Sequence, residues 1–459
     1  MFAIPGIIAL VAFIYLHPQD VFHVLERLPF LYLFFALVLF GWAVDLRLRV
    51  SRPRMSPQLP WVLALIGWTA LSLAIKAPEH MVDGAKELAI PVALYLVIAH
   101  GVQSFRALAQ VAVAIAVIVG FLAVVGVHQG TADWQCVRAM PSSPHEFIGI
   151  PDGRPCTEAL ECFRDPEPGA DYVCERVGLF GTISIASGRV RYRGVLQDPN
   201  ELSLALAIGL PFMFALFAWR KTVFRFAVAA AGTVLVFLCV LFSQSRGGLL
   251  VFAAVIAVYV LRRFGKRGVV WGITVAIPMA MLIVASGGDR RDASASTAER
   301  LDAWAAGIDI FKGSPLFGVG PGQFTEYHYL TAHNSFILMP AELGFVGFFL
   351  WAMVLYVSVR IPVSVLARWG KDPAARVAQV WATAMLAALA GLYVGSFFLS
   401  FGYHHVLWIY LGLAGALAQA TTAHDPDFCV RPRWWEAVGV GAVAAALIAG
   451  FYLYFRVTG

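Results

Sequence analysis

Charged residues are scarce in this chain. Only 14% of its 459 residues are Asp, Glu, Lys or Arg, whereas 60% are hydrophobic. A soluble domain carries about 25% charged residues, and a water-facing surface could not accommodate so much apolar side-chain area. With a mean hydropathy of +0.75, the composition excludes an ordinary soluble protein and indicates a chain that crosses a membrane many times.

Cysteine is also sparse, and the six present are unevenly placed. No pair is spaced as C-x2-C, so a zinc site is weakly supported. Disulfides in an oxidising compartment, here a bacterial periplasm, are the better interpretation, and four cysteines allow three pairings. The candidates lie in one segment rich in Pro, Gly and charge: Cys136, Cys156, Cys162 and Cys174.

Long apolar runs take up most of the chain. A helix needs roughly 20 apolar residues to cross a hydrocarbon core of about 30 Å. The first run has no small-residue cleavage site and is followed by more apolar runs, so we expect an anchor rather than a removed signal peptide. Thirteen runs are candidates, several of them short: 2–18, 29–45, 60–75, 87–100, 106–127, 200–219, 226–243, 247–261, 269–286, 335–360, 379–400, 404–420 and 434–455.

Basic residues predict which loops face the cytoplasm, because Lys and Arg near short loops are retained there. Clusters at 47–54, 220–225, 262–267 and 360–376 fall on one side. The net charge of +6 mostly marks topology and gives no indication of nucleic-acid binding. We therefore predict an all-α polytopic membrane protein of about 12–13 transmembrane helices. Helices in 1–127, 200–286 and 335–459 are separated by periplasmic regions 128–199 and 287–334.

Several arginines lie in the outer regions, against the positive-inside bias. A guanidinium at the bilayer edge is costly unless it is paired or hydrated, so such residues are candidates for function. They precede a membrane run, occupy the tight turn at 243–248, or begin an expected helix: Arg189, Arg191, Arg193, Arg246 and Arg300.

Structural explanations compete with function for most of these arginines. Arg189 and Arg193 could be ordinary loop charges, and Arg290 and Arg291 lie in a polar stretch that favours solvation. Arg300 could stack on Trp304, four residues later on the same helix face. For Arg246 the tight turn leaves little room to reach water, which favours function.

Five motifs in the outer regions carry a family resemblance. The chain resembles the bacterial O-antigen ligase and polymerase superfamily from about 190 to 400, most closely the O-antigen ligases, and before that only the hydropathy pattern agrees. The sequence Asp-Pro-Asn-Glu-Leu at 198–202 is also similar to O-glycosylation ligases associated with exosortase systems. The motifs are R-G-x3-D-P-N at 193–200, S-x-S-R-G at 243–247, R-x3-W at 300–304, G-V-G-P-G at 318–322 and H-N-x9-G-x2-G at 333–347.

The resemblance implies lipopolysaccharide biosynthesis at the periplasmic face of the bacterial inner membrane. A glycan carried on undecaprenyl pyrophosphate would be moved to an acceptor hydroxyl, most simply a sugar of the lipid A core. It also implies twelve spans with both ends inside, whereas thirteen would leave the C-terminus outside. No metal or nucleotide cofactor is expected, and the only D-x-D, at 425–427, lies on the predicted inner side.

Other activities remain open at this point. An O-antigen polymerase would use the same donor, and a related ligase would use a protein or an exopolysaccharide anchor as acceptor. A transporter of lipid-linked glycans would place polar residues near the midplane and repeat its halves. The candidates here gather at one face, and the 335–360 pattern does not recur.

Arginine and histidine suit the expected chemistry. Breaking the glycosyl–pyrophosphate bond builds negative charge on the leaving phosphate, which arginine meets with paired hydrogen bonds. We predict this role for Arg246, Arg300 and either Arg191 or Arg193. His333 is the expected base, kept neutral by the positive end of a helix capped by Asn334 or Ser335, although a lone histidine there could be only a cap.

Four further residues are expected to bind or orient substrate. Asp198 and Asn200 would shape the donor site, although capping alone could account for one of them. Asn334 adjoins the candidate base. Glu342, inside a membrane helix, needs a partner, which we expect to be Arg246. His404 and His405 could assist at another outer turn, but an interfacial role is preferred.

Overall fold

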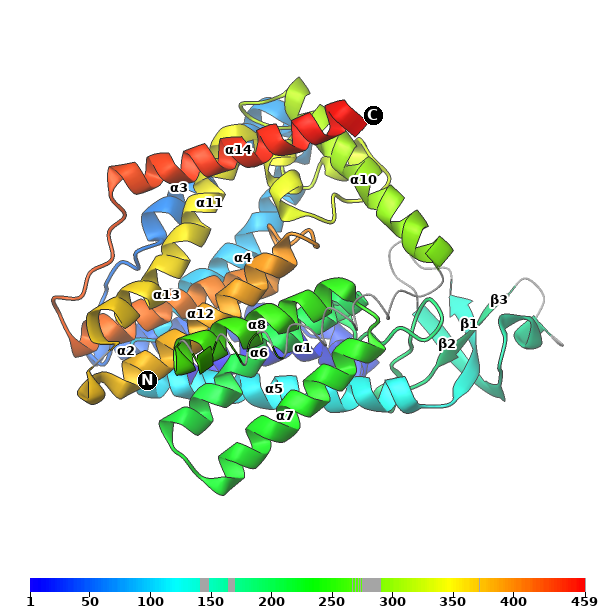
Figure 1. The fold of residues 1–459 in the computed structure, drawn as a ribbon, viewed down its shortest axis with the longest axis horizontal. Helices are drawn as coiled ribbons and strands as arrows, with labels where there is room; N and C mark the ends of the chain where they lie inside the picture. Colours follow the sequence, from blue (N-terminus) through cyan, green and yellow to red (C-terminus); the bar gives the residue numbers. More distant parts are fainter. Residues whose placement is uncertain are drawn as a thin grey trace.

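The computed structural model describes residues 1–140, 148–163, 170–265, 267–268, 270, 272, 274, 290–370 and 372–458. Helices dominate the described part (Figure 1). Ten of its helices are long and apolar enough to cross a membrane, and a shorter apolar helix lies at the N-terminus. The prediction of an all-α polytopic membrane protein is confirmed, and the predicted run at 269–286 lies largely outside the described residues.

The helices follow the predicted runs closely. α1 stops at a left-handed His17 (φ 44°), and α4 starts before the apolar run at 87. The α-helices are α1 (Ala3–Leu16), α2 (Phe30–Arg47), α3 (Leu59–Lys76), α4 (Met81–Gly101), α5 (Phe105–Thr131), α6 (Pro199–Trp219), α7 (Val223–Phe242), α8 (Arg246–Phe264), α10 (Arg290–Gly313), α11 (Ser335–Trp369), α12 (Arg376–Ser396), α13 (His405–His424) and α14 (Trp434–Thr458).

Short 3-10 helices occur in the connections. They are η1 (Pro18–Asp20), η2 (His23–Arg27), η3 (Pro78–His80), η4 (Ala159–Phe163), η5 (Leu179–Gly181), η6 (Gly194–Leu196), η7 (Phe324–Glu326) and η8 (Pro373–Ala375).

The bundle is centred on α6, α12 and α13, which are mostly buried, whereas α14 is mostly exposed. Small residues let the central helices approach closely, as is usual between membrane helices. A Cβ atom on Gly395 of α12 would lie 1.9 Å from the Leu204 side chain of α6, and one on Gly415 of α13 would lie 2.7 Å from Ala99 of α4. These glycines set the spacing of the core.

The two chain ends lie at opposite ends of the bundle (Figure 1). The amino group of Met1 is 3.9 Å from Asp45, beside the basic segment 47–54, so we call this the inner end. Near the C-terminus, Phe451 contacts Trp304 of α10, which belongs to the outer end. Chain ends on opposite sides correspond to an odd number of crossings, and the number of spans stays a prediction because the run at 269–286 lies largely outside the described residues.

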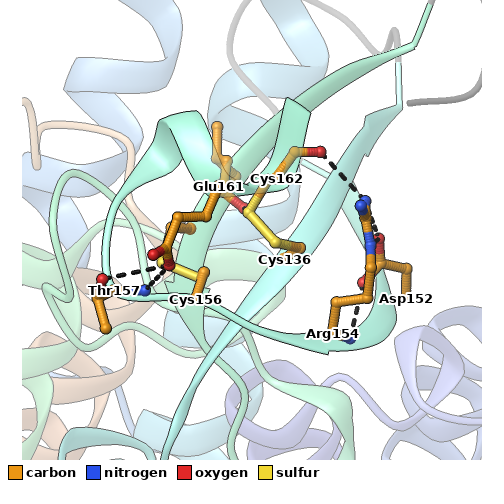
Figure 2. The surroundings of a disulfide bond; sticks show 9 residues. Cys136, Asp152, Arg154, Cys156, Thr157, Glu161 and Cys162 are labelled. Carbon is orange, nitrogen blue, oxygen red and sulfur yellow. Dashed lines mark hydrogen bonds and ion pairs between the residues drawn. A yellow bond between two sulfur atoms is a disulfide. The ribbon is translucent and has the colours of Figure 1, made fainter. Parts of the chain in front are cut away.

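A three-stranded antiparallel sheet extends from the outer end, a feature that the all-α prediction for 128–199 did not include. β1 (Trp134–Met140) lies between β2 (Ile148–Pro155) and β3 (Asp171–Arg176). Of the three possible pairings, the structure contains Cys136–Cys162 and Cys156–Cys174. Figure 2 shows the first of these beside Arg154, whose guanidinium donates to the Cys162 carbonyl (3.1 Å).

Because all four cysteines of this region form disulfides, they do not offer thiolate ligands for zinc. The sulfur atoms of Cys136, Cys156 and Cys162 lie within 4.8 Å of one another, but each is consumed by a disulfide bond. Together with Tyr172, the cysteines form the small core of this sheet, which is too thin to bury much apolar surface of its own.

The long helix α11 is broken at Gly344 (φ 67°, ψ −173°). The break frees backbone carbonyls inside the membrane region, where an unsatisfied group is costly. The amide of Val319 donates to the Ala341 carbonyl (3.1 Å), that of Gly320 to the Glu342 carbonyl (2.9 Å), and the Trp68 indole to the Leu343 carbonyl (2.9 Å).

Two motif glycines are explained by this docking. A Cβ atom on Gly344 would lie 2.1 Å from the Leu316 carbonyl oxygen, and one on Gly318 would lie 2.2 Å from the Glu342 backbone. Both residues have positive φ, which glycine adopts without strain. The G-V-G-P-G turn is therefore the partner of the break in α11.

Gly344→Ala should destabilise the protein strongly, because a left-handed alanine costs about 1–3 kcal/mol and its methyl group would also displace the Leu316 carbonyl. Gly450→Ala in α14 is the matched control, since a Cβ atom there meets nothing within 4 Å. Thermal unfolding in detergent measures both. Equal melting temperatures for the two variants would contradict the packing of this turn.

Candidate functional site

Five segments meet at the outer end of the bundle. Residues 189–193 run beside the α7–α8 turn, where the Val190 amide donates to the Phe242 carbonyl (3.1 Å) and Arg189 Nε donates to the Ser243 carbonyl (3.2 Å). Segments 331–335 and 397–404 join through the Ser335 hydroxyl, which donates to the Leu399 carbonyl (2.7 Å). α10 completes the group through Trp304, whose ring meets Phe397 edge-on.

A chain of side-chain hydrogen bonds connects two of the sequence motifs. The Ser245 hydroxyl donates to Asn200 Oδ1 (2.6 Å), and Asn200 Nδ2 donates to Asp198 Oδ1 (2.8 Å). Each end of the chain also caps a helix, because Asp198 accepts from the Asn200 amide (2.6 Å) and Ser245 accepts from the Gly248 amide (2.9 Å). The motif at 243–247 and the motif at 193–200 therefore form one unit.

The start of α8 must lie close to α6 for this unit to form. A Cβ atom on Gly248 would lie 2.2 Å from the Ser203 hydroxyl, so the second glycine after Arg246 allows the contact. Pro199 occupies the first position of α6, where its missing N–H costs nothing. The sequence thus fixes the direction of the Asp198 carboxylate locally.

Four basic residues from three segments interact electrostatically with Asp198: Arg189, Arg191, Arg300 and His333. Burial lowers the pKa of the Arg300 guanidinium, Asp198 opposes that shift, and Arg189 adds to it. Burial also lowers the pKa of Arg191 to about 10. Crowded, partly desolvated cations of this kind are suited to an anion with several oxygens.

The alternative of Arg300 stacking on Trp304 is wrong for the described residues. The Trp304 ring packs edge-on against Phe397 and Phe451 instead, and no cation–π contact involving Arg300 is found in the described part of the chain. Arg300 faces the charged cluster.

His333 directly precedes the N-cap residue of α11 and has a left-handed conformation (φ 46°). Asn334 is the helix cap, because its Oδ1 accepts from the Phe336 amide (2.9 Å), whereas the Ser335 hydroxyl accepts from the Phe401 amide (2.8 Å). Burial lowers the pKa of His333, the Arg300 guanidinium lowers it further, and Asp198 and Glu299 oppose these shifts. The imidazole is therefore neutral at neutral pH.

Arg191 and Arg193 have different structural environments. Arg191 Nε donates to the Ile183 carbonyl (3.0 Å) and its side chain is buried. The Arg193 guanidinium donates to the carbonyls of Asp20, Phe180 (2.7 Å) and Gly181 (2.8 Å). Arg193 therefore holds three loop positions together, which favours Arg191 over Arg193 as the member of the anion site.

Two expectations about Arg246 are wrong. Its side chain is exposed, so the tight turn does not confine it. Glu342 is not its partner: the buried Glu342 Oε1 accepts from the Phe324 amide (3.1 Å), and the described residues contain no ion pair between the two. Glu342 supports η7 and the turn docked into α11.

Sequence reasoning undervalued Arg189 and missed Glu175. The buried Glu175 carboxylate accepts from the Ser184 hydroxyl (2.5 Å) and from the Ser187 and Gly188 amides (3.1 and 3.0 Å). It shapes the turn that leads into Arg189 and is the strongest opposing charge on Arg191. Nothing local in the sequence singles it out, since the contact spans β3 and a later turn.

His404 has a capping role, in line with the interfacial interpretation. Its Nδ1 accepts from the Val406 amide (3.2 Å), so Nε2 carries the proton and donates to the Val195 carbonyl (3.2 Å). Burial, with His405 nearby, lowers the pKa of His404 to about 3. Both ring nitrogens of His404 are engaged in hydrogen bonds, so this ring is not available as a base.

Residues 231–352 match the family model described as O-antigen ligase. This segment is similar to O-antigen ligases. The matched segment includes Arg246, Arg300 and His333, so the resemblance to the ligase and polymerase superfamily is confirmed, while the exosortase-associated subgroup stays a prediction. No curated protein matches the chain.

Replacing Arg246 or Arg300 of the matched segment by Lys should reduce glycan transfer by about one to two orders of magnitude, because each loses the fork that binds two phosphate oxygens. Arg154→Lys is the control, since a lysine can keep the ion pair with Asp152 on the outer sheet. Transfer is measured with purified protein at equal amounts. Near-normal rates for both site variants would return these arginines to structural roles.

Proposed function

We propose that this protein is a glycosyltransferase of the bacterial inner membrane, with its site facing the periplasm. It moves a glycan from an undecaprenyl-pyrophosphate carrier to an acceptor hydroxyl, most simply ligating O-antigen to the lipid A core. The observation that carries the proposal is the joint placement of Arg300 and His333 beside Asp198 at the outer end, within and next to the segment that matches the family model.

The periplasmic orientation is supported from both ends of the bundle. The basic segments lie at the inner end, as in cytoplasmic loops, and the two disulfides lie at the outer end, as in an oxidising compartment. A lipid-linked donor reaches this level from the membrane, with its pyrophosphate at the bilayer surface.

The arginines act on the leaving group. When the bond between the sugar C1 and the pyrophosphate oxygen breaks, the electron pair goes to that oxygen and a negative charge develops. Arg189 and Arg191 are held by hydrogen bonds to backbone carbonyls before substrate binds, so they need little reorganisation, and Arg300 adds its charge near Asp198. The exposed Arg246, at the start of α8, adds a further donor. The chain's own cations meet the charge, and the proposed mechanism includes no cofactor.

His333 acts on the acceptor. Its neutral imidazole takes the proton of the acceptor hydroxyl while the hydroxyl oxygen forms the new bond to C1. Burial and Arg300 favour the neutral ring, and Asp198 stabilises the imidazolium that results. Asn200 and Asn334 are positioning residues: Asn200 directs Asp198, and Asn334 holds the start of α11.

His333→Ala and His333→Asn should both lose transfer by about two to four orders of magnitude, the range expected for a missing general base. Asparagine tolerates the left-handed backbone at this position, so the protein should fold and still bind the lipid-linked donor. The assay uses purified protein, lipid-linked glycan and core-lipid acceptor. Full activity of the Asn variant would show that His333 serves only the backbone.

The same assay scores both products. Glycan on the core acceptor supports a ligase, whereas a longer lipid-linked glycan without transfer to the core would indicate a polymerase.

In the active protein, the acid limb of the pH–rate profile should lie below pH 6.5, the ordinary pKa of histidine, because burial and Arg300 lower the pKa of His333. An acid limb above pH 6.5 would contradict the assignment of the base.

A further inference from the structure

A basic cavity lies at the inner end, far from the site described above. Its volume is about 480 Å³. α11 contributes one side, and the segment leading into α14 contributes the other. Its lining residues are Arg360, Ser364, Cys429, Val430, Arg431 and Arg433.

The charges of this cavity are not balanced. Arg360 pairs with Glu436 (2.9 Å), whose other oxygen accepts from the Arg433 amide (2.7 Å). The exposed Arg431 makes no hydrogen bond or ion pair with any residue that the structure describes, and the Arg433 guanidinium lies 5.0 Å from the Trp435 ring centroid. Three arginines therefore line the cavity, and of these only Arg360 is paired with a carboxylate among the described residues.

Neighbouring aromatic residues place the cavity at the level of lipid headgroups. Trp434 and Trp435 begin α14 and are 74% and 50% exposed. Exposed tryptophans at the end of a membrane helix lie at the boundary between hydrocarbon and water. Because α14 is mostly exposed along its length, lipid can reach the cavity along this helix.

We propose that this cavity binds the phosphodiester headgroup of an anionic phospholipid of the inner leaflet. Arg431 and Arg433 would contact the phosphate oxygens in paired fashion, and the acyl chains would lie against α14. A basic pocket between helices on the cytoplasmic side is suited to such a ligand. The proposal does not depend on the reaction catalysed at the outer end.

Cys429 provides a reporter for the occupied cavity. It lines the cavity and is exposed, the other free cysteine of the described chain, Cys239, is buried, and the remaining four form disulfides. A maleimide added to the full-length protein in detergent, without reductant, should therefore label Cys429. Phosphatidylglycerol should slow this labelling, whereas phosphatidylcholine, which has no net charge, should not.

Arg431→Gln should raise the phosphatidylglycerol concentration for half-protection about fivefold, the loss expected for one arginine contact near a membrane surface. Arg262→Gln, an exposed arginine in the last turn of α8, is the matched control and should leave that concentration unchanged. Arg431 makes no contact that folding would require. The melting temperature of the Arg431→Gln variant without added lipid should therefore equal that of the parent protein.

Several results would overturn the proposal. Equal protection by phosphatidylcholine would mean that lipid covers Cys429 without recognising charge, and equal protection by inorganic phosphate would mean that the cavity takes a free anion. An unchanged half-protection concentration in Arg431→Gln would mean that Arg431 does not contribute to the protection of Cys429 by phosphatidylglycerol. If the variant failed to fold, the comparison of the two lipids on the parent protein would still decide the question.

Discussion

The outer end of this protein depends on the hydrogen bonds made by Asn200. This one amide joins Ser245, at the start of α8, to Asp198, at the start of α6. Because Asp198 also interacts with Arg300 and His333, the amide connects the membrane core to the charged cluster. Without the Asn200 side chain, the Asp198 carboxylate could turn toward water. The surrounding cations would then lose the carboxylate with which they all interact.

The second constraint is the break in α11. A straight helix from Ser335 to Trp369 would leave no place for the G-V-G-P-G turn, which satisfies the carbonyls exposed at the break. This docking and the Glu342–Phe324 contact hold the connection from α10 to α11. The position of His333 relative to Arg300 therefore depends on Gly344, inside the membrane region. This dependence explains why the motifs contain glycines with no chemical role beside residues with reactive side chains.

Hydropathy and charge predicted the membrane helices well, because the cost of burying charge in hydrocarbon acts on each segment separately. They did not predict the outer sheet, whose strands are stapled by disulfides rather than marked by a long apolar pattern. The break at Gly344 was also hidden, since the residues around it are as apolar as a continuous helix. Both features depend on contacts between distant segments.

The candidate site shows the same division. Motif order indicated that Arg300, His333 and Asp198 belong together, and the caps at Asp198 and Asn334 follow from local sequence. The exposure of Arg246, the loop contacts of Arg193 and the hidden support from Glu175 could not be predicted, because they depend on which loops meet after folding. From the sequence alone Arg189 could be an ordinary loop charge, whereas in the structure it interacts electrostatically with Asp198 and Arg300.

The central claim is that Asp198, Arg300 and His333 form one electrostatically coupled site. The most direct test is the pKa of His333, measured by histidine-selective NMR with its signal assigned by loss in His333→Ala. Asp198→Asn should lower this pKa and Arg300→Gln should raise it, because each removes the opposite influence, while Asp309→Asn, whose partner is Lys312, should leave it unchanged. A His333 pKa that moves in neither site variant would contradict the claim.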